Sequence, residues 1–233
     1  MTQSDSIYQS GEYLENNPDW HAADAPFKAK WIDSILDRNK IQAGEVTEIG
    51  CGSGEILVEL KNMHPQIQFN GYDISEQAYR ICSKKASPGL FFHQGNFLSL
   101  KTPPADVLLA IDVFEHVDDY MFFIRALKNR AIWKVFHIPL DLSVQGLLRG
   151  TPIMYSRNVV GHLHYFYKDT ALAVLKDCGL EVVDWNYTHG AESLPNRKLR
   201  TKILNLPRKM FRAIDEDLAI RVLGGASIMV LAR

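Results

Sequence analysis

Residues 48–54, Glu-Ile-Gly-Cys-Gly-Ser-Gly, have the residue types and the spacing of a turn that binds a nucleotide. Gly50, Gly52 and Gly54 remove every second side chain, so a ligand can lie directly against the backbone. A helix is predicted to begin at Glu55, and the N-terminus of a helix favours polar and anionic ligand groups. The alternative is a tight turn with no ligand. The spacing Gly-x-Gly-x-Gly differs from the Gly-x-Gly-x-x-Gly of nicotinamide-binding folds.

Strands and helices are predicted to alternate around this turn. Apolar or alternating stretches predict strands, and amphipathic stretches predict helices between them. The run 105–111 is almost continuously apolar, as expected for a strand that is covered on both faces. The pattern therefore favours an α/β fold with a parallel, doubly wound sheet. The predicted strands are 45–49, 67–73, 90–93, 105–111, 131–138, 180–187 and 226–232, and the predicted helices are 27–39, 55–63, 76–86, 118–130 and 168–178.

The motifs at the ends of these strands resemble those of the class I S-adenosylmethionine-dependent methyltransferases. The resemblance is carried by residues 48–54, Asp73, residues 95–97 (Gly-Asn-Phe) and residues 112–117 (Asp-Val-Phe-Glu-His-Val). It implies a Rossmann-like, seven-stranded and mostly parallel sheet with an antiparallel last strand. Residues 112–117 and 161–166 are most similar to small-molecule O-methyltransferases, of the ubiquinone pathway or of surface-saccharide synthesis.

The resemblance also implies that S-adenosylmethionine is the cofactor and that strand-end residues bind it. Glu48 and the glycine turn would hold the methionine part, Asp73 would bind the ribose hydroxyls, and Asp112 would lie beside the sulfonium. For Asp112 the alternative is a structural role in capping a turn. Ile74, Asn96 and Phe97 would surround the adenine. The cofactor-binding residues that the resemblance implies are thus Glu48, Gly50, Gly52, Gly54, Asp73, Ile74, Asn96, Phe97 and Asp112.

Methyl transfer from a sulfonium requires the acceptor to be held near the methyl group, in line with the departing sulfur. A general base is needed only where the acceptor loses a proton, as a hydroxyl does. The candidate catalytic residues are His116, which follows the strand 105–111, and His164. His162 alternates with His164, so the two share a face if this segment is extended. A structural role is the alternative for each, and His137, inside an apolar strand, is expected to be a buried or an edge histidine.

Other kinds of site have less support. Glu115 and His116 are adjacent, so their side chains are expected to point apart, and no metal site is predicted. The three cysteines form no CxxC pair, which favours a reduced protein without disulfides or a zinc site. The sequence lacks the Gly-x-Ser-x-Gly of a hydrolase elbow, the Tyr-x-x-x-Lys of short-chain dehydrogenases and the Asn/Asp-Pro-Pro-Tyr/Phe of nucleic-acid methyltransferases.

Residues 1–233 are expected to form a single domain with three additions. Residues 1–43 form an N-terminal helical extension, in which Trp20 faces the sulfonium and Lys28 pairs with the methionine carboxylate. A solvated arm is the alternative. Residues 139–166, read as a substrate loop, and residues 189–225, read as a helical insertion before the last strand, are expected to build the acceptor pocket.

Residues 193–214 are rich in Lys and Arg and contain no acidic residue. Apolar residues are interleaved with the basic ones, as in an amphipathic basic element. Contact with an anionic ligand such as a phosphorylated or nucleotide-linked acceptor, with an anionic membrane surface or with RNA is one interpretation. A solvated surface helix is the other.

The composition limits the partners. A net charge of −1 gives no overall attraction to nucleic acid. No apolar run approaches the roughly 20 residues of a membrane-spanning helix, and residues 1–5 lack the features of a signal peptide. We expect a cytoplasmic methyltransferase that acts on oxygen, or on nitrogen, of a small-molecule or saccharide acceptor. The alternative is a cofactor-binding protein of the same fold that is not catalytic. The sequence gives no indication of the oligomeric state.

Overall fold

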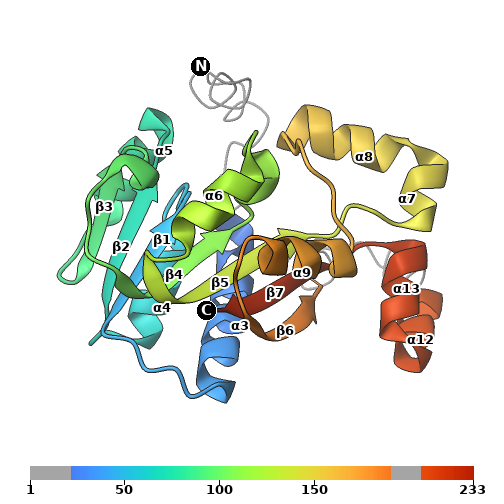
Figure 1. Ribbon diagram of the computed structural model, residues 1–233, viewed down its shortest axis with the longest axis horizontal. Helices are drawn as coiled ribbons and strands as arrows, with labels where there is room; N and C mark the ends of the chain where they lie inside the picture. The colour runs from blue at the N-terminus through green and yellow to red at the C-terminus, as the bar shows by residue number, and fades with distance from the viewer. Residues whose placement is uncertain (1–21, 190–205) are drawn as a thin grey trace.

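The computed structural model describes residues 22–189 and 206–233, which form a seven-stranded sheet with helices on both faces (Figure 1). The strand order is β3-β2-β1-β4-β5-β7-β6. Neighbouring strands from β3 to β5 are parallel, whereas β7 is antiparallel to both β5 and β6. The predicted doubly wound, mostly parallel sheet with an antiparallel last strand is confirmed.

The seven strands begin and end within two residues of their predicted positions. They are β1 Glu45–Ile49, β2 Gln68–Asp73, β3 Leu90–Gln94, β4 Ala105–Ile111, β5 Ala131–Pro139, β6 Val182–Thr188 and β7 Ser227–Ala232. The α-helices of the described residues are α3 Ala25–Arg38, α4 Glu55–Met63, α5 Glu76–Cys82, α6 Tyr120–Leu127, α7 Val144–Arg149, α8 Thr151–Tyr155, α9 Lys168–Asp177, α12 Leu206–Ile214 and α13 Glu216–Leu223. Within residues 22–189 and 206–233 no helix is long and apolar enough to cross a membrane.

The central strand β4 is buried on both faces, as its apolar run predicts. Val107 and Leu109 pack with α3 and α4, and Leu108 and Ala110 pack with α6 and α9 on the other face. All four side chains are fully buried. The sheet therefore divides the core into two apolar layers.

The helix α3 covers part of one sheet face, so the described part of the N-terminal extension is packed rather than solvated. Pro26 lies in its first turn, where a proline costs no intrahelical hydrogen bond. Ala29, Ile32 and Ile35 recur at helical spacing, are fully buried, and join the cluster that contains residues of β1 and β4. Residues 1–21 lie outside the described part of the chain.

The segment 139–166, predicted to be a loop, is mostly helical. Its helices α7 and α8 and a π-helical turn, Ser156–Val160, lie beyond the carboxyl edge of the sheet (Figure 1). Ser143 caps α7, because its Oγ accepts a hydrogen bond of 3.0 Å from the N–H of Gly146. Gly150, with φ of 67°, separates the two helices. The helices are too short to give a clear periodic pattern.

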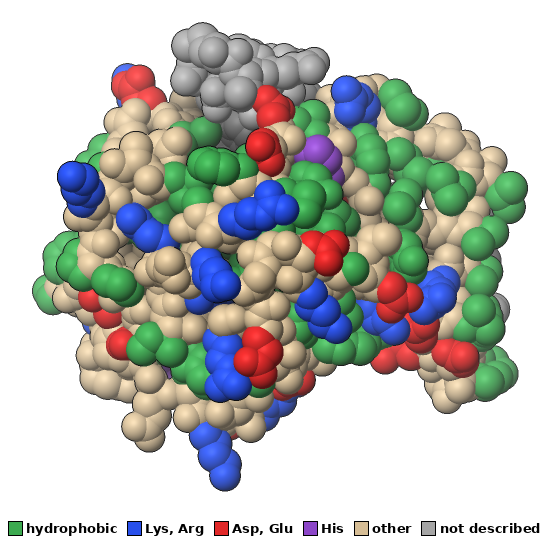
Figure 2. Space-filling model, viewed as in Figure 1, with side chains coloured by type: hydrophobic (Ala, Val, Ile, Leu, Met, Phe, Trp, Pro, Cys, Tyr) green, Lys and Arg blue, Asp and Glu red, His purple; other side chains and the backbone are tan. Residues whose placement is uncertain are grey.

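The segment 189–225, predicted to be a helical insertion, contains the helices α12 and α13 in its described part. Hydrophobic side chains are visible along the outer edge formed by α7, α8, α12 and α13 (Figure 2). The exposed ones include Leu147, Leu148, Met154, Tyr155 and Ile214. These two added segments thus carry apolar surface on the outside of the fold.

Candidate active site

A cavity of about 1050 Å³ opens at the carboxyl ends of β1, β2 and β4. The glycine turn, the strand-end aspartates and Lys28 of α3 line one part of it. Residues 139–162 and 223–227, together with Arg208 of α12, contribute the other part. The two added segments therefore face the same space as the predicted cofactor residues, which is the arrangement expected of a two-substrate site.

The glycine turn follows β1 and is held in a tight conformation. The N–H groups of Gly50 and Cys51 both donate to the carbonyl of Tyr72, at 2.8 and 3.1 Å. All three glycines have positive φ, 69°, 52° and 77°. A Cβ on Gly50 would lie 2.8 Å from Val113, and one on Gly54 would lie 2.5 Å from the ring of Phe92. Side chains therefore do not fit at these two positions.

Asp73 ties the end of β2 to this turn. Its carboxylate accepts hydrogen bonds of 2.8 Å from the N–H of Gly52 and from the N–H of Ser75. Burial raises the pKa of Asp73, while the two backbone donors oppose that rise. Ile74, next in the chain, is 47% exposed and lines the cavity. An apolar side chain thus lies beside a carboxylate, as the adenine and ribose of a nucleoside would require.

Glu48, the last-but-one residue of β1, lies in the cavity wall with one oxygen unsatisfied. Its side chain is only 1% exposed, and Oε2 has no hydrogen-bond partner among the described residues. Burial raises the pKa of this carboxyl to about 8. A positively charged donor in the cavity would relieve that cost.

Asp112, just past β4, is the centre of a charged cluster. It has a φ of 53°, which is unusual for a residue other than glycine. One oxygen lies 2.8 Å from Nζ of Lys28, and the other accepts from Nδ1 of His137 at 2.5 Å. Although burial alone would raise the pKa of Asp112, His137 and Lys28 outweigh it and hold that pKa below its usual range. His137 is buried, as predicted, and its Nε2 lies 2.8 Å from Thr188 Oγ1.

Asn96 and Phe97 line the cavity but also have local structural roles. The side-chain oxygen of Asn96 accepts a hydrogen bond of 2.9 Å from the N–H of Leu98, capping a short 3-10 turn. Phe97 is buried with its ring centroid 4.9 Å from that of Tyr72. The amide oxygen keeps a second lone pair. The predicted adenine contact of Asn96 therefore stays a prediction.

The histidines divide into two groups. His116 and His162 are buried and line the cavity. His164 is absent from the cavity wall of the described chain, and its Nε2 donates to the carbonyl of Val117 at 3.0 Å. Its ring also lies 4.4 Å, centroid to centroid, from that of Tyr120. Of the histidine pair, His162 rather than His164 faces the site.

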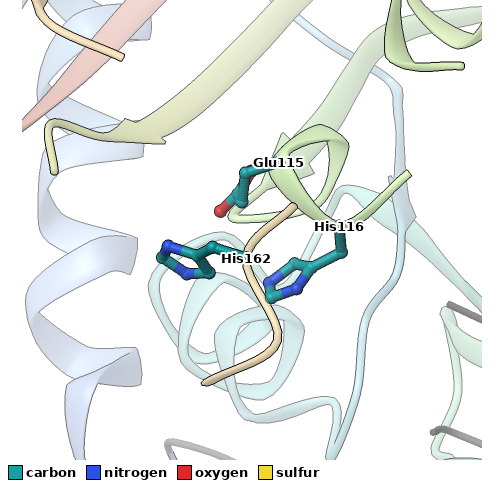
Figure 3. Close-up of side chains that lie close together, drawn as sticks. All are labelled: Glu115, His116 and His162. Atoms are coloured by element: carbon teal, nitrogen blue, oxygen red, sulfur yellow. The ribbon is translucent and has the colours of Figure 1, made fainter. Parts of the chain in front are cut away.

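Glu115, His116 and His162 converge, which the sequence interpretation did not foresee (Figure 3). Ligand atoms of the three residues lie within 4.8 Å of one another. Glu115 and His116, predicted to point apart as neighbours on a helix or strand do, lie in a 3-10 turn, Phe114–His116, and their ligand atoms are close to one another. His162 reaches them from a distant part of the chain. That contact has no local sequence signal.

Two of the predicted features fall partly or wholly outside the described residues. Trp20 and residues 193–205 of the basic segment lie outside them. In the described remainder, Arg208 lines the cavity and donates to the carbonyl of Leu223 at 3.2 Å. It offers a positive charge to the part of the cavity lined by residues 139–162 and 223–227.

Comparisons with known proteins identify a methyltransferase domain in this chain. Residues 47–131 match the family model described as a methyltransferase domain. This range contains the glycine turn, Asp73, Asn96 and Asp112, and it ends where β5 begins. The added segments after β5, which line the rest of the cavity, lie beyond the match.

Two relatives match over about a third of this chain. One is the methyltransferase ungE' of Aspergillus campestris, 34% identical over 73 residues, which are 31% of this chain and 20% of that protein. The other is a tRNA (guanine-N(7)-)-methyltransferase of Limosilactobacillus fermentum, 29% identical over 76 residues, which are 32% of this chain and 34% of that protein. The matched region thus spans 20% and 34% of the two relatives' lengths.

The fold extends the likeness over most of the chain. The magnesium protoporphyrin IX methyltransferase of Synechocystis, solved with bound SAH, superposes with a TM-score of 0.60. The superposition covers 90% of this chain and 83% of that one, at 14% sequence identity. At this identity the likeness concerns the fold.

Proposed function

We propose that this chain, which contains a methyltransferase domain with the class I fold, transfers a methyl group from S-adenosylmethionine to oxygen, or to nitrogen, of a small-molecule or saccharide acceptor. The observation that carries the proposal is the glycine turn hydrogen-bonded to Asp73, with Glu48 in the same cavity, whose Oε2 has no hydrogen-bond partner among the described residues. Those groups match the ribose hydroxyls and the amino group of one ligand.

The residues present fit this cofactor, which supplies a methyl group on a positively charged sulfur. Glu48 would accept from the amino group, since its buried Oε2 has no partner in the described part of the chain. Asp73 has one backbone donor on each oxygen and retains lone pairs for the ribose. Asp112, held ionised by His137 and Lys28, would place negative charge near the sulfonium.

The acceptor would occupy the part of the cavity lined by residues 139–162 and 223–227. His116 lies there and is our candidate for the group that accepts a proton from an acceptor hydroxyl. Asp141, Ser143 and Arg208 line the same part and offer both donors and acceptors to a hydroxylated or anionic ligand. These polar groups favour a small polar acceptor, and we expect the reaction to take place in the cytoplasm.

Cofactor binding is the first test. Saturating S-adenosylmethionine or S-adenosylhomocysteine should raise the melting temperature of the protein, because a ligand that binds only the folded state stabilises it. NAD should not. Absence of a shift with both sulfur ligands would overturn the proposal.

Catalysis is tested separately, because a protein of this fold can bind the cofactor without using it. Formation of S-adenosylhomocysteine is measured with panels of phenols, catechols, amines and nucleotide sugars. Transcribed tRNA is included because one relative is a tRNA methyltransferase. Turnover with tRNA alone would move the acceptor to nucleic acid, and binding without any turnover would favour the non-catalytic alternative.

A further inference from the structure

Glu115 is fully buried, and neither oxygen of its carboxyl group has a hydrogen-bond partner among the described residues. A buried carboxyl group that makes no hydrogen bond carries a desolvation cost, and this cost is larger when the group is charged. Such a group implies a ligand that completes it.

Two imidazoles lie beside this carboxylate in fixed orientations. His162 Nδ1 donates to Asp141 at 2.6 Å, and His116 Nδ1 donates to the carbonyl of Gly161 at 3.0 Å. Histidines that bind metals usually donate their other ring N–H to a carboxylate or a carbonyl, which fixes the tautomer and orients the ring. Both rings here have that second contact.

The backbone holds the three residues together. The carbonyl of Glu115 accepts from the N–H of Leu163 at 2.8 Å and from the N–H of His164 at 3.1 Å. This docks the segment that carries His162 onto the 3-10 turn that carries Glu115 and His116. The ring centroids of the two histidines are 4.9 Å apart. The cluster is therefore a built arrangement of buried groups.

We propose that Glu115, His116 and His162 bind one divalent transition-metal ion at the acceptor side of the cavity (Figure 3). Two imidazoles and one carboxylate suit Zn²⁺, Fe²⁺, Co²⁺ or Mn²⁺. Three protein ligands leave coordination positions for an exogenous group, and His116 and His162 both face the cavity. The role of the ion rests on the proposed function: with the ion bound, His116 would be a ligand instead of the proton acceptor, and the ion would bind an acceptor oxygen and lower the pKa of that hydroxyl, so that its proton passes to water.

Cobalt binding tests the site without cofactor or acceptor. Tag-free protein, stripped of metal with a chelator, is titrated with Co²⁺ and followed by visible absorption and calorimetry. We expect one saturable Co²⁺ per chain without the intense charge-transfer band of a thiolate ligand. Glu115→Gln and His162→Gln should each weaken binding at least tenfold. The control is His64→Gln, which removes an imidazole paired with Asp33 at 2.6 Å, at the end of α4.

Misfolding is separated from loss of the ligand by a second measurement. Glu115→Gln keeps the shape of the side chain, so the variant should fold. Saturating Co²⁺ should raise the melting temperature of the wild type and of His64→Gln but not of Glu115→Gln. Absence of saturable binding, or equal binding by Glu115→Gln and the wild type, would overturn the metal site. Binding of S-adenosylhomocysteine is measured independently, so failure of either proposal is recognised by itself.

Discussion

Lys28 of α3 and Asp112 at the end of β4 form an ion pair, with 2.8 Å between Nζ and Oδ2. Both side chains are largely shielded, at 13% and 26% exposed. The pair joins the N-terminal extension to the edge of the sheet at which the glycine turn lies. The sequence interpretation directed Lys28 at the cofactor's carboxylate and Asp112 at its sulfonium. In the free protein each has the other as partner.

Replacing Lys28 should affect both stability and cofactor affinity. Lys28→Met leaves Asp112 with His137 alone, so we expect a loss of about 2 kcal/mol in the free energy of unfolding, between the values for exposed and buried pairs. The affinity for S-adenosylhomocysteine should fall about tenfold, since a charged hydrogen bond contributes about 1.5 kcal/mol. Lys168→Met is the control, because Lys168 pairs with Asp217 at 2.5 Å away from the cavity. Unchanged affinity in Lys28→Met would remove Lys28 from the cofactor site.

Asp73 is expected to be the strongest single contributor to cofactor binding. Asp73→Asn keeps the size of the side chain but loses the charge that accepts from Gly52 and Ser75. We expect the Kd for S-adenosylhomocysteine, measured by calorimetry, to rise ten- to a hundredfold, about 1.5–3 kcal/mol for a hydrogen bond to a charged group.

Asp106→Asn is the matched control for this change. Asp106 also accepts from two backbone N–H groups, those of Gly44 and Glu45, but before β1 instead of after it. Its replacement should lower stability and leave the Kd unchanged. Equal effects of the two substitutions on the Kd would show that Asp73 acts only through the stability of the fold.

The glycine turn can be tested with Ala substitutions at two glycines of positive φ. Gly50 has a φ of 69°, and Gly161, which ends the π-helical turn in the left-handed helical region, has a φ of 87°. A Cβ on Gly50 would lie 2.8 Å from Val113, whereas one on Gly161 would lie 3.6 Å from His116, an ordinary contact. Both Ala variants should lose about 1 kcal/mol for the positive φ. Chemical denaturation should show a further loss of about 1–3 kcal/mol in Gly50→Ala alone, the usual cost of overpacking, and equal losses would contradict the contact with Val113.

Much of the fold was predictable because its signals are local. The apolar run of β4, the period of α3 and the glycine turn each lie within a few residues. The shared edge of Asp73 and Asp112 followed from them, since the carboxyl ends of parallel strands meet at one edge, whereas the cofactor roles of these residues came from the family resemblance. The short helices α7 and α8 were missed because neither extends over two full turns of apolar pattern.

Local sequence could not decide which of two alternating histidines faces the site. His162 and His164 alternate, so the sequence allowed either to face the site. The choice depends on the contacts of Leu163 and His164 with the carbonyl of Glu115, which join segments distant in the chain. Those contacts turn His162 toward the cavity and direct His164 to Val117. Only the folded chain determines that choice.

Glu48 should make stability depend on pH. Burial raises its pKa from 4.5 to about 8, so between these values the folded protein keeps a proton that the unfolded chain releases. The contribution of Glu48 to the free energy of unfolding is therefore fully present below pH 4.5. It is lost as the pH rises towards 8, by up to about 1.4 kcal/mol per pH unit. Glu48→Gln should flatten this slope in urea unfolding at pH 6 and pH 8. Glu45→Gln, at the other end of β1, is the control.

Cofactor binding should reverse that preference for the protonated form. The amino group of S-adenosylhomocysteine, placed beside Glu48, would stabilise the carboxylate, so binding would release a proton and tighten as the pH rises from 6 to 8. Calorimetry in two buffers of different ionisation enthalpy measures the released proton directly. In Glu48→Gln both the proton release and this pH dependence should disappear. If the variant binds with the same affinity and the same pH profile as the wild type, Glu48 shapes the turn and does not contact the cofactor.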